Sequence, residues 1–187
     1  MYIRIHAILT GSSVNGPGVR NVVWFQGCTL NCPGCFNRLT HDPNGGRLIS
    51  TDDLCEVLLS PEFPCDGITV SGGEPFQQPE GLLSLLKNLR ARNTPPVLVF
   101  SGYIYTQLLD EPVRNTCLPF IDALICGPYD RNSPSAYDRF CSSSNQELYL
   151  LSDRLKKEDF SGLPLSEVII DDRGKAIVSG LMQLRSK

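Results

Sequence analysis

Short apolar runs alternate with amphipathic segments over most of this chain, and this order constrains the fold more than any other feature. Strands are expected at 19–26, 67–70, 97–100, 121–125 and 147–151. Helices are expected at 51–59, 79–92 and 103–109. Strands that are apolar throughout are typical of a parallel sheet covered by helices on its faces. The sequence therefore predicts an α/β fold with mostly parallel strands.

The length of the chain limits how far such a sheet can close. A closed barrel of eight strand–helix units needs about 250 residues, and this chain has 187. We expect a single domain over residues 1–187, built as a partial, open β/α barrel. Two apolar triplets near the end flank residues 171–174 and predict a C-terminal hairpin at about 167–180.

Glycine turns follow the predicted strands and mark one edge of the sheet. They are Gly27, Ser71-Gly72-Gly73, Ser101-Gly102 and Gly127. The carboxyl ends of parallel strands meet at the same edge, which is where α/β proteins carry their sites. We therefore expect the functional residues to gather at these turns.

Three cysteines crowd into eight residues directly after the first of these strands. Cys28, Cys32 and Cys35 have the spacing C-x3-C-x2-C. Thiolates are the usual ligands of iron–sulfur clusters, and three of them can hold three irons of a [4Fe–4S] cluster. The fourth iron then has no protein ligand and stays open to a substrate. The remaining cysteines are scattered: Cys55, Cys65, Cys117, Cys126 and Cys141.

Two other uses of the cysteines stay open at this point. A structural zinc site needs four ligands, and His41, six residues beyond Cys35, could be the fourth. A thiol–disulfide pair of the C-x2-C type would leave one cysteine of the three unexplained.

Charge and hydropathy exclude several classes of function. The net charge is −3, so the chain has no basic excess with which to neutralise nucleic-acid phosphates. The first residues lack the pattern of a signal peptide, and no run of about 18 apolar residues predicts a membrane-spanning helix. We expect a soluble cytoplasmic protein that binds neither nucleic acid nor membrane.

The cysteine loop resembles the C-x3-C-x2-C motif of the radical SAM superfamily, whose members bind S-adenosylmethionine (SAM). Residues 32–37, Cys-Pro-Gly-Cys-Phe-Asn, are similar to the version found in the enzymes that activate glycyl-radical enzymes, in particular anaerobic ribonucleoside-triphosphate reductase. Four further segments resemble the same activating enzymes: 15–20, 71–75, 101–103 and 143–146. Two positions depart from the pattern: Gly34 replaces a frequent aromatic residue, and Ser142 stands where glycine is usual.

The resemblance implies a role for each matched residue. The cluster ligands, and the catalytic centre, are Cys28, Cys32 and Cys35. The residues implied to contact SAM are Gly34, Phe36, Asn37, Gly72, Gly73, Glu74 and Ser101. Those implied for the partner or the SAM pocket are Asn15, Gly16, Gly18, Arg20, Asn145 and Gln146.

The resemblance also implies a reaction and its partners. A [4Fe–4S] cluster reduced by a flavodoxin or ferredoxin would cleave SAM, and a hydrogen atom would be taken from a glycine of a partner glycyl-radical enzyme. Anaerobic ribonucleotide reductase is the partner expected first. One alternative is a compact radical SAM enzyme that modifies a peptide or small molecule. A second is a non-enzymatic iron–sulfur or zinc protein.

Overall fold

The computed structural model describes residues 1–135, 140–170, 174 and 176–180, and within them nine strands form two sheets. The strands of the main sheet are β1 (Tyr2–Ser12), β2 (Arg20–Phe25), β3 (Arg47–Ser50), β4 (Gly67–Gly72), β5 (Val97–Ser101), β6 (Ala123–Cys126) and β7 (Glu147–Leu150). The second sheet consists of β8 (Ser166–Ile170) and β9 (Ala176–Gly180). The α-helices are α1 (Thr51–Leu58), α2 (Pro79–Ala91), α3 (Tyr105–Asp110) and α4 (Pro112–Asn115).

The main sheet is mostly parallel and open. Its strand order is β3-β1-β2-β4-β5-β6-β7. The neighbours β2, β4, β5 and β6 run parallel, whereas β1 and β7 flank them in antiparallel orientation. Parallel neighbours need long crossovers, which the helices between these strands supply. The predicted α/β class with mostly parallel strands is confirmed, and β3 and β7 form the two edges of a sheet that does not close.

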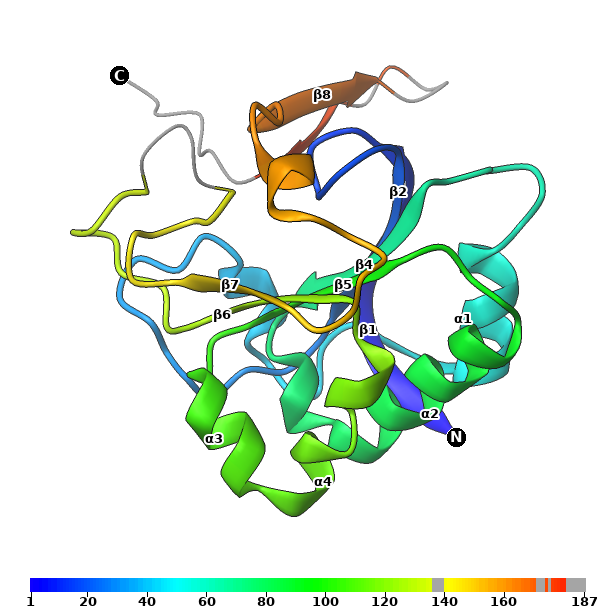
Figure 1. Ribbon diagram of the computed structural model, residues 1–187, viewed down its shortest axis with the longest axis horizontal. Helices are drawn as coiled ribbons and strands as arrows, with labels where there is room; N and C mark the ends of the chain where they lie inside the picture. The colour runs from blue at the N-terminus through cyan, green and yellow to red at the C-terminus, as the bar shows by residue number, and fades with distance from the viewer. Residues whose placement is uncertain (136–139, 171–173, 175, 181–187) are drawn as a thin grey trace.

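The helices cover one face of the sheet and form the larger core with it. Figure 1 shows α1 to α4 together on one side of the main sheet. The leucines of α2 recur at helical spacing and lie buried against the strands: Leu82, Leu85, Leu86 and Leu89. In the described part of the chain, no helix is long and apolar enough to cross a membrane.

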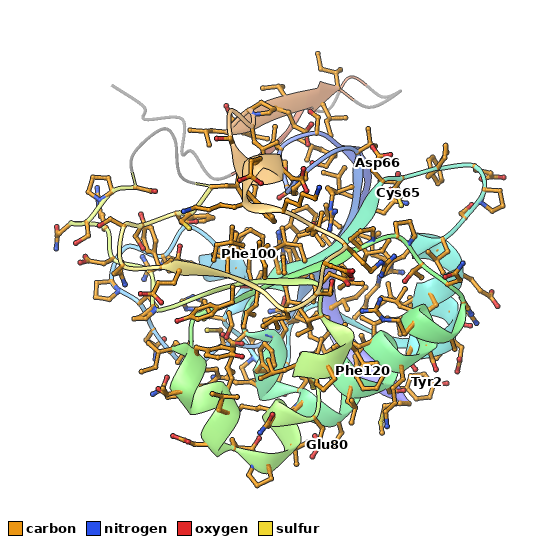
Figure 2. All side chains as sticks on the ribbon, in the orientation of Figure 1. Tyr2, Cys65, Asp66, Glu80, Phe100 and Phe120 are labelled. Atoms are coloured by element: carbon orange, nitrogen blue, oxygen red, sulfur yellow. The ribbon has the colours of Figure 1, made fainter. Side chains whose placement is uncertain are left out.

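The connection between β6 and β7 and the chain that follows β7 together cover the opposite face. Leu98 and Ile125 of the sheet pack there with Phe140, Leu155 and Phe160 in a second buried cluster. Figure 2 shows Phe100, which also packs against this cluster, at the centre of the sheet. Because both faces of the parallel strands are covered, these strands carry apolar residues on both faces.

The second sheet is the predicted C-terminal hairpin. Its strands pair with Val168 opposite Val178, and the residues between them at 171–173 and 175 lie outside the described residues. Ser12 donates a hydrogen bond of 2.6 Å to Glu167 of β8, and Asn15 donates one of 2.7 Å to Ser179 of β9. These bonds attach the hairpin to the end of β1 and to the segment that follows it.

Strands β1 and β3 and helix α4 were not among the predicted elements. Strand β3 and helix α4 are four residues long each, too short to show a period. Strand β3 exists because it pairs with β1 in antiparallel register, Ile3 opposite Ile49. The predicted strand at 121–125 begins later, at Ala123, because residues 118–120 form a 3-10 turn.

One buried carboxylate connects the segment after β7 to the sheet and to α2. Asp122 is fully buried and forms ion pairs with Arg90 at 3.2 Å and Arg154 at 3.1 Å. Its carboxylate also accepts hydrogen bonds from the Val97 backbone N–H and the Ser152 hydroxyl. Three separate segments therefore depend on this side chain.

We expect Asp122→Asn to lower the free energy of unfolding by about 3 kcal/mol, because it leaves two arginines without their carboxylate. Urea denaturation of the metal-free protein measures the change. Asp153→Asn, at an exposed neighbouring position, is the control and should change the stability by less than about 0.5 kcal/mol. Equal effects of the two substitutions would contradict the role given to Asp122.

Candidate functional site

The cysteine loop leaves the carboxyl end of β2 and returns on itself. The Gly27 N–H donates to the Thr40 carbonyl at 2.7 Å, and the Cys28 N–H donates to the His41 carbonyl at 3.1 Å. These two bonds close the base of the loop. Asn31 and Gly34 have positive φ values of 50° and 74°, and these left-handed residues turn the chain back between the cysteines.

All three cysteines of the loop are free thiols and partly exposed. Burial raises the pKa of the Cys28 thiol, and burial likewise raises the pKa of the Cys35 thiol. Iron that binds here displaces these protons, so cluster loading is coupled to deprotonation of the thiols. Among the described residues, no group of three or more His, Cys, Asp or Glu side chains surrounds a single metal-ion position.

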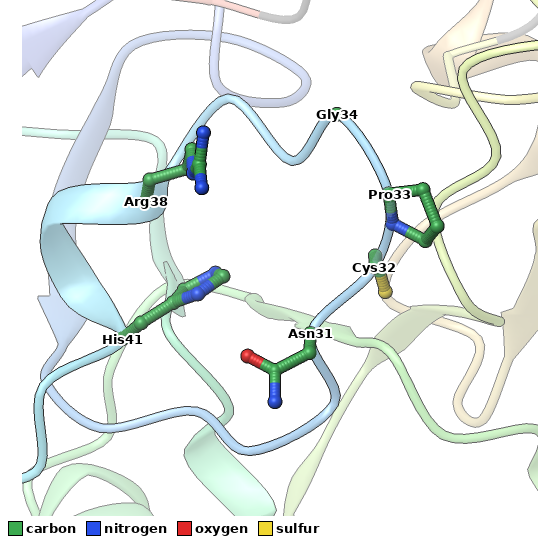
Figure 3. Close-up of a pocket in the computed structure, with 6 residues that line it drawn as sticks. All are labelled: Asn31, Cys32, Pro33, Gly34, Arg38 and His41. Carbon is green, nitrogen blue, oxygen red and sulfur yellow. The ribbon is translucent and has the colours of Figure 1, made fainter.

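A hollow of about 210 Å³ opens within the loop. Figure 3 shows the side chains of Arg38 and His41 directed toward the space that the loop encloses, with Asn31 and Cys32 on its wall. Pro33 and Gly34 complete the lining. The wall of the hollow is thus polar and includes one of the three thiols.

The glycine turn after β4 is hydrogen-bonded directly to the cysteine loop. The Gly73 N–H donates to Phe25 O and the Glu74 N–H to Gly27 O, each at 2.9 Å. The Asn37 amide donates to the Gly72 carbonyl at 3.3 Å. A Cβ added to Gly73 would lie 2.4 Å from Gly27 O. Only glycine permits this close approach, and it brings the two predicted motifs together.

Glu74 joins the ends of β4 and β5. Its side chain is fully buried and accepts hydrogen bonds from the Ser101 hydroxyl, the Gly102 N–H and the Phe76 N–H at 2.7–3.0 Å. Burial raises the pKa of Glu74 from 4.5 to about 7, against the lowering effect of these donors. Both carboxylate oxygens therefore have partners within the protein, and Ser101 lies with Glu74 at the same edge.

The end of β6 supplies a fourth segment of the site. Asn145 donates to Pro128 O at 2.6 Å and Gln146 to Gly127 O at 3.0 Å, which fixes the turn after β6. The next residues of that segment reach the cysteine loop. Tyr129 packs edge-on against Phe36 with ring centroids 5.5 Å apart, and a Cβ added to Gly34 would lie 2.7 Å from Arg131. Sequence reasoning missed Tyr129 and Arg131, because no motif spacing marks them.

The predicted pocket residues that precede β2 lie at the opposite ends of the parallel strands, where β2 and β4 begin. Asn15, Gly16 and Gly18 precede Arg20, which pairs with Gly67 at the amino ends of β2 and β4. Cys65 and Asp66 mark this region in Figure 2. The structure does not bring these residues to the cysteine loop, and their role in the pocket stays a prediction.

Arg20 itself is fully buried without an ion-pair partner among the described residues. Its guanidinium donates to the Thr69 hydroxyl and to the carbonyls of Pro17, Ile68 and Pro96. Burial lowers the pKa of Arg20 from its ordinary value to about 10. Its hydrogen bonds join the starts of β4 and β5 to the segment before β2.

The residues present fit an iron–sulfur cluster. Three thiols on one loop are the donor set of such a cluster. The turns beside them are glycines whose Cβ positions are already occupied: at Gly72 an added Cβ would lie 2.4 Å from Phe25 N, and at Gly102 2.4 Å from Leu30. These glycines let the ends of β4 and β5 pack directly against β2 and the cysteine loop.

Comparison with known proteins agrees with this chemistry. A family model described as a 4Fe-4S single cluster domain matches residues 14–149. The chain belongs to this single-cluster family of radical SAM proteins. The match covers every residue proposed above for the cluster and for SAM, from Asn15 to Gln146.

Individual relatives differ in how much of their length this radical SAM chain spans. It is 30% identical to the anaerobic ribonucleoside-triphosphate reductase-activating protein of Enterobacteria phage T4, over 78% of this chain and 93% of the relative. It is 37% identical to the pyruvate formate-lyase-activating enzyme of Clostridium pasteurianum, over 64% of this chain. The chain spans about half the length (51%) of that relative. The crystal structure of QueE from Escherichia coli aligns with a TM-score of 0.45 and 18% identity, over 55% of this chain and 53% of that one.

We expect Gly73→Ala to lower the iron content after anaerobic reconstitution about tenfold, because the new Cβ separates the β4 turn from the base of the cysteine loop. Iron and acid-labile sulfide per chain measure the loss. Gly162→Ala is the control for loss of a glycine elsewhere: its φ of 68° disfavours alanine, but its added Cβ meets no other part of the protein within 4 Å, so it should load normally. Normal loading of Gly73→Ala would show that the contact is dispensable.

A second expectation concerns the pH dependence of the metal-free protein. Because the folded-state pKa of Glu74 lies above 4.5, its contribution to stability is full below that pH and is lost as the pH rises through 7. Between about pH 4.5 and 8, the free energy of unfolding of wild type should fall by about 3 kcal/mol relative to that of Glu74→Gln. Urea denaturation across this range measures the difference, with Glu80→Gln as an exposed control. A difference that is constant with pH would refute the assignment.

Proposed function

We propose that this protein is a radical SAM activase that generates a glycyl radical on a partner enzyme, with residues 1–187 acting as one radical SAM domain. The observation that carries the proposal is the contact between two motifs. The loop bearing Cys28, Cys32 and Cys35 is hydrogen-bonded to the Gly72-Gly73-Glu74 turn. Membership of the single-cluster family and the names of the relatives support the same reading.

Each part of the site has a task in this proposal. The three thiolates would hold a [4Fe–4S] cluster, which when bound supplies the electron that breaks the carbon–sulfur bond of SAM. The backbone at Gly72 and Gly73 would receive the SAM amino group. Glu74 keeps this turn in place through Ser101. Phe36 and Asn37, with Gly34, would line the side of the SAM pocket next to the third cysteine.

An anaerobic ribonucleotide reductase is the partner we propose first. The relative of that kind is matched over 93% of its length, so the compact chain corresponds to nearly all of it. A pyruvate formate-lyase is the second candidate, because the relative with that name is 37% identical. A compact enzyme that acts on a peptide or small molecule would share the same cluster site.

Electrons would come from a flavodoxin or ferredoxin. The loop that carries the cysteines lies at the surface, where Thr29, Asn31, Pro33 and Gly34 are exposed. Leu39, in the 3-10 turn just beyond the loop, is 81% exposed. A protein donor could therefore approach the cluster without a large rearrangement. The cytoplasmic location stays a prediction from the sequence.

The first experiment asks whether the site cleaves SAM. Wild type and Cys32→Ala are reconstituted anaerobically, and 5′-deoxyadenosine is measured after SAM and dithionite are added. We expect product from wild type and at least a hundredfold less from Cys32→Ala, on the order of the losses caused by removing a catalytic group. Cys65→Ala controls for loss of a cysteine outside the loop. A loaded cluster without product, with either candidate partner present, would favour the non-enzymatic metal-binding alternative.

The second step identifies the partner. Wild type with SAM and reductant is mixed with an anaerobic ribonucleotide reductase or with a pyruvate formate-lyase, and each mixture is followed by electron paramagnetic resonance. A glycyl signal whose splitting collapses when the partner carries α-deuterated glycine would identify the substrate. Product formation without a radical on either protein would instead point to a peptide or small molecule.

A further inference from the structure

Gln77 contacts the cysteine loop although no motif includes it. It ends the 3-10 turn η2 (Pro75–Gln77) that follows the glycine turn of β4. Its Oε1 accepts a hydrogen bond from the Thr29 backbone N–H at 3.0 Å, and its Nε2 donates to the Thr29 hydroxyl at 2.9 Å. Thr29 is the residue directly after Cys28. The Gln77 side chain therefore binds both the backbone and the side chain of Thr29, and so holds the chain next to the first cysteine.

The other end of the Gln77 amide is fixed by a second network. Its Nε2 also donates to the Tyr103 phenol oxygen at 3.2 Å. Arg114 donates to the same oxygen at 3.2 Å, lies 4.1 Å from the centroid of the Tyr103 ring, and donates to the Phe76 carbonyl. The Gln77 side chain is thus anchored on the segment after β5 and on α4. Thr29 is exposed, and the hydrogen bonds described for it are the two with Gln77.

The two arms of the cysteine loop are held very differently. The returning arm is fixed at Thr40 and His41 by backbone bonds, and Gln26 donates to the carbonyls of Leu39 and Asp42. On the arm between Cys28 and Cys32, the hydrogen bonds to the rest of the described chain, beyond the base of the loop, come from Gln77. Removal of Gln77 therefore takes these hydrogen bonds from one arm, where Leu30 still packs beside Gly102, and leaves the bonds of the other arm in place.

We propose that Gln77 is a positioning residue for the cluster, which holds the Cys28–Cys32 arm in the geometry that iron binding requires. The task needs an amide, because one side chain must accept from a backbone N–H and donate to two hydroxyl oxygens at once. Groups that orient metal ligands change metal affinity about 10–100-fold when they are lost. The inference rests on the cluster of the proposed function and is independent of the partner.

The test compares Gln77→Met, which keeps the length of the side chain, with Gln107→Met. Gln107 is an exposed glutamine of α3 that accepts a hydrogen bond from the Ile104 N–H and does not contact the loop in the described structure. In metal-free protein, the Thr29 amide should exchange with deuterium at least about tenfold faster in Gln77→Met. After anaerobic reconstitution, a chelator should remove iron from this variant about 10–100-fold faster than from wild type. Gln107→Met should match wild type in both measurements.

A second variant distinguishes loss of the hydrogen bond from misfolding of Gln77→Met. Thr29→Val removes only the hydroxyl that accepts from Gln77, at an exposed position, and should speed iron loss in the same direction by a smaller factor. Unchanged urea midpoints would show that the fold is intact. Iron loss at the wild-type rate in both variants would overturn the inference. A wild type that retains iron but yields no 5′-deoxyadenosine would overturn the proposed function and leave the role of Gln77 standing.

Discussion

The site depends on a close backbone contact between the ends of two parallel neighbours. Strands β2 and β4 pair from Arg20 opposite Gly67 to Phe25 opposite Gly72. Beyond the last pair, the Gly73 and Glu74 N–H groups continue to bond with Phe25 and Gly27. The cysteine loop begins at this continuation, so its position follows from the register of the sheet. A shift of that register would separate the thiols from the glycine turn.

Each end of the parallel strands carries one buried ionisable group, and the two groups connect different segments. At the carboxyl end, Glu74 is surrounded by donors and holds two turns together. At the amino end, Arg20 is surrounded by carbonyls and joins the starts of β4 and β5. Burial disfavours the charged form of both groups, as their pKa shifts show. Each is tolerated because hydrogen bonds replace much of the lost hydration.

The segment after β7 completes the fold rather than the site. It covers the sheet face opposite the helices through Leu155 and Phe160, which pack there with Phe140 of the β6–β7 connection. Asp122 connects it to β5 and α2 through Arg154 and Arg90. The hairpin beyond it is attached by Glu167 and Ser179 to the segment before β2. An open sheet of this kind needs such a cover, because the apolar side chains on this face would otherwise be exposed to water.

The sequence by itself determined the α/β class, the parallel strands and the three-thiol loop, because apolar runs, glycine turns and cysteine spacing are local patterns. It also identified the Gly72-Gly73-Glu74 turn and Ser101, which share one edge. It did not predict that Asn15, Gly16, Gly18 and Arg20 lie at the other edge, since the direction of β2 separates segments that are close in sequence. Tyr129, Arg131 and Gln77 join the site only through tertiary contacts, which have no fixed spacing along the chain. The tertiary structure alone decided these contacts, because the pairing of strands and the packing of turns bring together side chains that are far apart in the sequence.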